Sequence, residues 1–266
     1  TATADEASQL LALTAVKAPR DDYSRANPAW NGAQAFGVPE AGFRFGVPDQ
    51  LEFLGCAESE ALYHRARERL MALGGVPVTI DFAPFLAAAT LLYDGPWVAE
   101  RYHVAGKLIE QQPEAVLPVI RDVLRKAPGT DAVAAFDAQY KLQHFKTLCD
   151  EIMAELDCVL TPTYPRPVTL AELAEEPVKR NSELGVYTNF MNLLDYAAVA
   201  VPAGVMANGL PSGVTLFGRA FTDQYLLSLA GALQRHQNLA LPGERQIQTA
   251  APATPATHDR LSFVVC

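Results

Sequence analysis

The spacing of apolar residues divides the chain into long stretches with a helical period and short runs with the pattern of strands. Apolar positions recur every three or four residues in much of the chain, which is typical of amphipathic helices. Helices are predicted over residues 4–13, 57–73, 82–111 with a break at 94–96, 114–127, 131–156 and 222–237. Strands are predicted at 43–48, 76–82, 197–204 and 212–220, and at the start of 157–165.

The alternation of these strands with helices indicates an α/β layered fold with a largely buried sheet. Residues 17–50 are rich in Pro and Gly, so we expect an irregular segment there, interrupted by the short strand at 43–48. Polar residues mark several helix starts. Thr3 and Glu6 have the spacing of a capping box. Pro96 suits the first turn of a new helix, and Thr222 or Asp223 caps the last one.

Composition narrows the class of protein. With 266 residues, 50% of them hydrophobic, the chain can bury a substantial core. Its net charge of −9, with scattered Lys and Arg, would be repelled by nucleic acid and by anionic membranes, so neither is expected as a partner. No apolar run is long enough to span a bilayer, and no secretory signal is visible.

Four cysteines are present, none in a CxxC pair, so neither a zinc site nor a disulfide framework is expected. Cys149 and Cys158 lie in an amphipathic stretch and are predicted to be buried free thiols. Free thiols fit a reducing, cytoplasmic setting.

No standard catalytic motif is present in the chain. The patterns GxGxxG, GxxxxGK[ST], HExxH and GxSxG do not occur, and the five histidines are isolated. Ser212, in "GLPSG" at 209–213, is nearest to a nucleophile pattern but is predicted to lie in a turn without the required spacing. The residues alone therefore assign no nucleophile and no metal site.

The composition shifts near the C-terminal end. Residues 1–242 are expected to form one unit, followed by an Ala/Pro/Thr-rich linker at 243–258. Residues 259–266 look like the first strand of a further domain, so we expect the natural protein to continue.

Several motifs, in order, resemble the C-terminal part of the amidase-signature enzymes. They are "GVYTNFMNLLDYAAVAVPAG" at 185–204 and "NGLPSGVTLFGRAFTDQYLLSLAGALQ" at 208–234. Together with "LLYDGPWVAERY" at 91–102 and "LTPTYPRPVTLAELAEEPVKRNSELGVYTNFMNLLD" at 160–195, they resemble the allophanate hydrolases more specifically. Those enzymes cleave allophanate, a carboxylated urea, to ammonia and carbon dioxide in urea degradation. The resemblance implies an amidase-signature-type mixed sheet flanked by helices, incomplete in this chain.

The resemblance also accounts for the missing nucleophile. In the family, a serine is activated through a second serine by a neutral lysine, in segments that lie upstream of the residues matched here. We therefore expect this chain to be part of a longer amidase domain, inactive alone and with no catalytic residue of its own. The family implies no cofactor and allows a homodimer.

The residues that the resemblance assigns to substrate binding are Tyr93 and Arg101, which match a tyrosine and an arginine that hold the substrate carboxylate. A planar guanidinium can donate two parallel hydrogen bonds to a carboxylate, and a phenol adds a neutral donor. The alternative is structural: Tyr93 belongs to the core, and Arg101 pairs with Asp94, Glu100 or another acid. Tyr187, Thr188, Asn189, Thr161 and Thr163 could equally face the site or pack inside the protein.

Three functions are compatible with these residues. The first is an allophanate-cleaving amidase whose substrate is a small amide with a carboxylate. The second is an amidase for another small amide, such as a biuret-type compound, although an uncharged amide would leave a buried arginine unpaired. The third is a non-catalytic binding or assembly module.

Overall fold

A mixed five-stranded sheet organises the part of the chain that the computed structural model describes, residues 1–32, 41–125 and 127–237 without the Asp94 side chain. Its strands are β1 (Phe43–Pro48), β2 (Gly75–Ile80), β3 (Cys158–Pro162), β4 (Tyr196–Val205) and β5 (Pro211–Arg219). They lie in the order β2-β1-β3-β5-β4. β1 is parallel to β2 and β3, whereas β5 is antiparallel to both β3 and β4.

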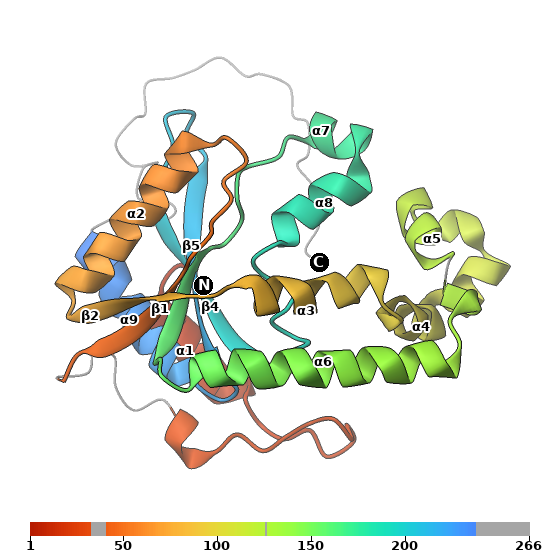
Figure 1. Ribbon diagram of the computed structural model, residues 1–266, viewed down its shortest axis with the longest axis horizontal. Coiled ribbons are helices and arrows are strands. Elements are labelled where there is room, and N and C mark those ends of the chain that lie inside the picture. Colours follow the sequence, from red (N-terminus) through yellow and green to blue (C-terminus); the bar gives the residue numbers. More distant parts are fainter. Residues whose placement is uncertain (33–40, 126, 238–266) are drawn as a thin grey trace.

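Helices surround this sheet (Figure 1). They are α1 (Ala4–Thr14), α2 (Ala57–Ala72), α3 (Ala83–Asp94), α4 (Trp97–Gln111), α5 (Pro118–Leu124), α6 (Ala132–Met153), α7 (Leu170–Glu175), α8 (Pro177–Gly185) and α9 (Asp223–Gln237). Short 3-10 helices cover Ala29–Asn31, Pro113–Ala115 and Ala127–Gly129. Among the described residues, no helix is both long and apolar enough to cross a membrane.

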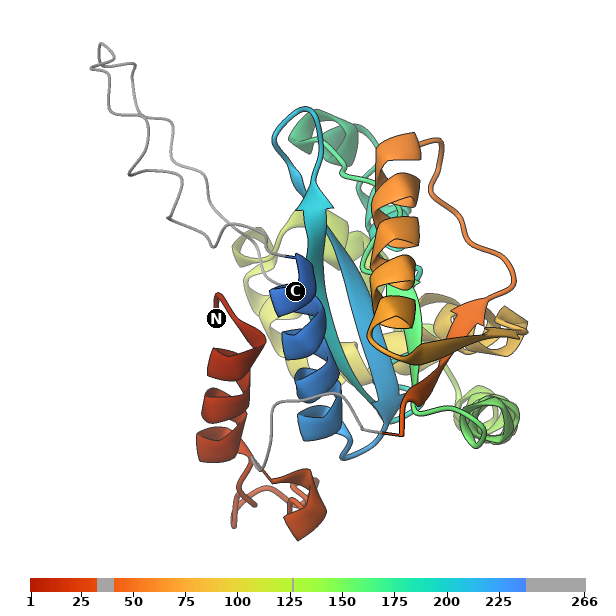
Figure 2. The same cartoon turned by 90° about the vertical axis from the view of Figure 1, so that its left-hand side faces the viewer.

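Two hydrophobic clusters fill the spaces on either side of the sheet. The first joins the strands to α2 and α9, and α1 packs against α9 from outside (Figure 2). The second joins the opposite face to α3, α6 and the segment before β4. Along β3 the sides alternate, so that Cys158 and Leu160 belong to the first cluster and Val159 to the second. The sheet is therefore covered by helices on both faces.

The junction between β1 and β3 is short. It has two residue pairs, Phe45 with Cys158 and Gly46 with Val159, whereas β1 and β2 pair over six residues. Hydrogen bonds beside the strands extend the junction: the backbone N–H of Arg44 donates to Asp157 Oδ2 at 2.7 Å, and the N–H of Asp157 donates to the Arg44 carbonyl at 2.9 Å. A small number of contacts thus joins the β1–β2 pair to the rest of the sheet.

The helices α4 and α5 form a lobe at one side of the molecule, and α6 extends from the sheet to this lobe (Figure 1). The lobe has a small apolar centre of its own, made by Val98, Leu124 and Ala127. The N-cap of α6 is Asp131, whose Oδ1 accepts the backbone N–H of Ala134 at 2.8 Å. This side-chain cap fixes the end of α6 that faces the lobe.

Most of the predicted elements are confirmed. The α/β fold with a mixed sheet, the capping box of Thr3 and Glu6, and the strand at 43–48 are all present. Cys149 and Cys158 are buried free thiols, as predicted. The linker at 243–258 and the strand at 259–266 lie outside the described residues, as does the end of the unit predicted for 1–242.

Two predictions needed correction, and two short helices were missed. The helix predicted over 114–127 is divided, because Pro118 cannot lie inside a helix and instead opens the shorter α5. Ser212 lies within β5 and is buried, not in a turn, because the turn closes earlier, with Met206 N–H bonded to the Leu210 carbonyl. The helices α7 and α8 were not predicted, because each is too short for a helical period of apolar residues to be recognised in the sequence.

Candidate functional site

The corner between α3 and α4 positions the two residues assigned to substrate binding. The N–H of Gly95 donates to the Leu91 carbonyl at 3.0 Å and closes α3, and Pro96 then precedes the first residue of α4. A Cβ on Gly95 would collide with the Leu91 carbonyl oxygen, so the tight corner requires glycine. As a result, the last turn of α3 and the second turn of α4 approach each other.

The structure brings Tyr93 and Arg101 together across this corner. The guanidinium carbon of Arg101 lies 5.0 Å from the centre of the Tyr93 ring, a cation–π contact. Both side chains are partly exposed. Within the described part of the chain, no acceptor is bonded to the Arg101 N–H groups, which are the groups that pair with a carboxylate.

The described residues bear on two parts of the structural alternative for this pair. Tyr93 is partly exposed and belongs to none of the described hydrophobic clusters. Within the described part of the chain, Arg101 has neither an ion pair nor a hydrogen-bond acceptor, so the pairing with Glu100 is not present. The pairing with Asp94 stays untested, because that side chain is not described.

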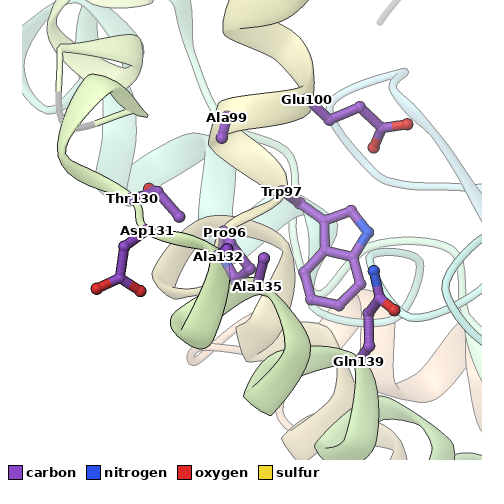
Figure 3. Close-up of a pocket in the computed structure, with 9 residues that line it drawn as sticks. All are labelled: Pro96, Trp97, Ala99, Glu100, Thr130, Asp131, Ala132, Ala135 and Gln139. Carbon is purple, nitrogen blue, oxygen red and sulfur yellow. The ribbon is translucent and has the colours of Figure 1, made fainter.

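A cavity of about 430 Å³ lies beside this corner, where the first turn of α4 meets the first turns of α6 (Figure 3). Trp97 and Gln139 form one wall, with the indole beside the amide group. The other lining residues are Pro96, Ala99, Glu100, Thr130, Asp131, Ala132 and Ala135. Tyr93 and Arg101 are not among them. The sequence reasoning missed this cavity, although Trp97 lies within the motif that supplied Arg101.

The five residues left open by the sequence have different surroundings. Tyr187 is buried, and its hydroxyl accepts the N–H of Glu52 at 2.6 Å and donates to the Glu52 carbonyl at 3.0 Å. Thr163 and Thr215 share a hydrogen bond of 3.0 Å between their hydroxyls. The buried hydroxyl of Thr161 has no hydrogen-bond partner among the described residues, and Thr188 is exposed. Tyr187 is therefore a packing residue.

Asn189 also has a close neighbour within its own segment. Its backbone N–H donates to the Gly185 carbonyl at 2.8 Å, and its side-chain amide lies where a Cβ on Gly185 would be. The partly buried amide is thus packed against the end of α8.

The described residues offer no activated nucleophile. Burial raises the pKa of the Cys149 thiol to about 12 and raises the pKa of Cys158 still further, so both stay protonated at neutral pH. Ser212 is buried in β5 and has no histidine or lysine bonded to it within the described part. In the same part of the chain, no group of three or more His, Cys, Asp or Glu side chains is placed to hold a metal ion.

Comparisons with known proteins agree on one family. The family model described as Amidase matches residues 1–227. Urea amidolyase from Lachancea kluyveri is 39% identical over 224 residues, covering 84% of this chain and 12% of that protein. Urea amidolyase from Saccharomyces cerevisiae is 37% identical over 205 residues, covering 76% of this chain and 11% of that protein. The chain thus spans only a small part of the relatives that it matches.

A solved structure shows the same fold at similar identity. The allophanate hydrolase of Kluyveromyces lactis superposes with a TM-score of 0.76 and is 35% identical. The match covers 81% of this chain and 35% of that one. The sheet and its helical layers are therefore shared with a solved hydrolase.

Proposed function

The chain belongs to the Amidase family, and we propose that it is part of an amide hydrolase that acts on allophanate. Support for this substrate comes from the 39% identity to a urea amidolyase and the 35% identity to an allophanate hydrolase. In this proposal the chain supplies the group that recognises the carboxylate, and residues outside it supply the nucleophile. The buried free thiols Cys149 and Cys158 support a reducing, cytoplasmic setting for the enzyme.

One observation carries the proposal: the Arg101 guanidinium lies against the Tyr93 ring, and no described acid pairs with this guanidinium. The partly exposed guanidinium keeps its N–H donors free of any described acid, so an anionic ligand can pair with them. Allophanate has one carboxylate and a neutral urea group, so one arginine satisfies its charge. The Tyr93 hydroxyl can add a hydrogen bond to the same carboxylate.

The experiment compares two substrates that differ at this group. Biuret has an amide where allophanate has its carboxylate, and it is otherwise similar in shape. In the complete enzyme, Arg101→Ala should raise KM for allophanate by roughly 10- to 150-fold, because a charge-assisted hydrogen-bonded pair contributes about 1.5–3 kcal/mol. Any turnover of biuret should change by less than about threefold. Ammonia release measures both reactions.

Arg101→Lys is the matched control, since lysine keeps the charge but cannot form the two parallel hydrogen bonds. It should recover part of the affinity lost in Arg101→Ala. Equal losses on allophanate and biuret would contradict the carboxylate role and would favour an amidase for another small amide. A complete enzyme that releases ammonia from neither substrate would favour the binding or assembly module.

A further inference from the structure

The cavity between the first turns of α4 and α6 has an aromatic wall, the indole of Trp97 (Figure 3). The neighbouring ring, Tyr93, has a cation of the protein on its face, the guanidinium of Arg101. Trp97 has no such cation, and no ring partner, within the described part of the chain. An indole attracts a cation more strongly than any other aromatic side chain does, so this wall suits a positively charged ligand.

The charge on the cavity wall is negative. Of the nine residues that line the cavity, the two that are ionisable are Glu100 and Asp131, both acidic. Glu100 is exposed and forms no hydrogen bond or ion pair with a described residue. The start of α6 contributes a partial positive charge of about half a unit, which is smaller than the charge of either carboxylate. The cavity therefore favours a cation over an anion.

The size of the cavity and its other groups indicate which kind of cation fits. A volume of about 430 Å³ is typical of sites for small organic molecules and far exceeds the volume of a metal ion. Ala99, Ala132 and Ala135 give the wall an apolar part. The Gln139 amide, beside the indole, forms no hydrogen bond with a described residue, so its oxygen can accept one from a ligand. A cation with an apolar body and N–H donors matches all of these groups.

We propose that this cavity binds a small organic ammonium compound. The ammonium group lies on the indole of Trp97 and donates hydrogen bonds to the Glu100 carboxylate and to Gln139 Oε1. The apolar body of the ligand packs against the alanine side chains. This site lies beside the corner of Tyr93 and Arg101 and selects the opposite charge, so it does not depend on the substrate proposed above.

The test is the binding of benzylammonium to the complete polypeptide at neutral pH, measured by isothermal titration calorimetry. Benzyl alcohol is the matched ligand, because it has the same ring and nearly the same size but no charge. Neither compound is an amide, so amide hydrolysis does not disturb the measurement. Benzylammonium should bind at least about tenfold more tightly than benzyl alcohol, since its hydrogen bonds are charge-assisted.

Variants of the cavity wall locate the bound cation. Glu100→Gln and Trp97→Leu should each raise the Kd for benzylammonium at least about threefold. Glu100→Gln should change the Kd for benzyl alcohol by less than about twofold, because only the charged ligand uses the carboxylate. Trp97→Phe keeps an aromatic face and should give an intermediate Kd, which also serves if Trp97→Leu does not fold. Asp137→Asn is the matched control: it removes an exposed acid of α6 that does not line the cavity, and should leave the Kd unchanged.

Three results would overturn the proposal. Wild type that takes up no benzylammonium at millimolar concentration would show that the cavity is not a site for such cations in the complete polypeptide. Equal affinity for benzylammonium and benzyl alcohol would show that the cavity does not select charge. A Kd for benzylammonium that is the same in wild type, Glu100→Gln and Trp97→Phe would place the bound cation elsewhere on the protein.

Discussion

At the scale of single residues, Tyr187 connects two distant parts of the chain. Its ring packs against Phe82 in the second hydrophobic cluster, and its hydroxyl bonds to both backbone groups of Glu52. The loop after β1 therefore depends on a side chain from the segment before β4. Burial raises the pKa of this phenol to about 12, so it remains a donor at neutral pH.

Replacing this phenol should reveal its structural role. Tyr187→Phe would leave the N–H and carbonyl of Glu52 without their partner and should lower the free energy of unfolding by about 1–3 kcal/mol. Tyr23→Phe makes the same change at a side chain that is 94% exposed. It should change the free energy of unfolding by less than about 0.5 kcal/mol. Urea unfolding of the purified variants compares them. Equal effects would mean that the Glu52 contact adds nothing.

At the scale of elements, α7 shows how a short helix is stabilised by its first turn. Thr169 and Glu172 form a capping box, and Arg166 Nη1 lies 2.9 Å from Glu172 Oε1. The hydrogen bonds from the Thr169 N–H and hydroxyl, with the contact to Arg166, lower the pKa of the Glu172 carboxyl from 4.5 to about 2. The ionised carboxylate therefore holds the start of α7.

This shift predicts a pH dependence with a definite sign. Because the folded-state pKa is depressed, the stabilisation by Glu172 is present above pH 4.5 and is lost as the pH falls toward about 2. Glu172→Gln should be less stable than wild type at pH 6, and the difference should shrink across that window. Urea midpoints at pH 6 and pH 3 measure it.

The exposed Glu175 on the same helix provides the control for that series. Its side chain has no hydrogen bond or ion pair within the described part of the chain. The urea midpoint of Glu175→Gln should therefore differ from that of wild type by a small amount that is the same at pH 6 and pH 3. A difference for Glu172→Gln that does not change between the two pH values would contradict the role given to Glu172.

The same elements show what could be predicted from the sequence. The helical spacing of apolar residues along α6 and their alternation in β1 were sufficient to predict both elements, because this spacing is local in the sequence. The helix α7 is six residues long and gives no period, although the Thr169 and Glu172 spacing was a usable signal. The pairing of Tyr93 with Arg101 came from a motif. The cavity beside Trp97 could not be predicted, because Gln139 reaches it only through the packing of α6 on the lobe.

At the scale of the whole molecule, the sheet consists of two parts joined at a short junction. β1 and β2 form a parallel pair, β4 and β5 form an antiparallel pair, and β3 lies between them. The β1–β3 contact of two residue pairs is reinforced by the bonds between Arg44 and Asp157. The β1–β2 pair is therefore the part of the sheet held by the fewest cross-strand bonds.

Weakening this junction should have a local effect. Asp157→Ala removes the acceptor for the Arg44 N–H, and the amides of β1 and β2 should then exchange with deuterium faster while those of β4 and β5 do not. Asp157→Asn keeps an acceptor oxygen and should behave like wild type. Hydrogen exchange followed by mass spectrometry resolves these segments. Equal acceleration in all strands would show that the sheet opens as one unit.

The position of β3 in the sheet also orders events during synthesis. β1 and β2 leave the ribosome before β3, the strand that covers the free edge of β1. Arg44 of β1 and Asp157, just before β3, are 113 residues apart in the chain. Until then β1 presents an open edge, which can pair with the wrong strand. β3 in turn needs β5, so the sheet closes only when Pro211–Arg219 has emerged. Nascent chains stopped before and after this strand would differ in protease resistance if assembly waits for it, and would not differ if β1 and β2 fold stably alone.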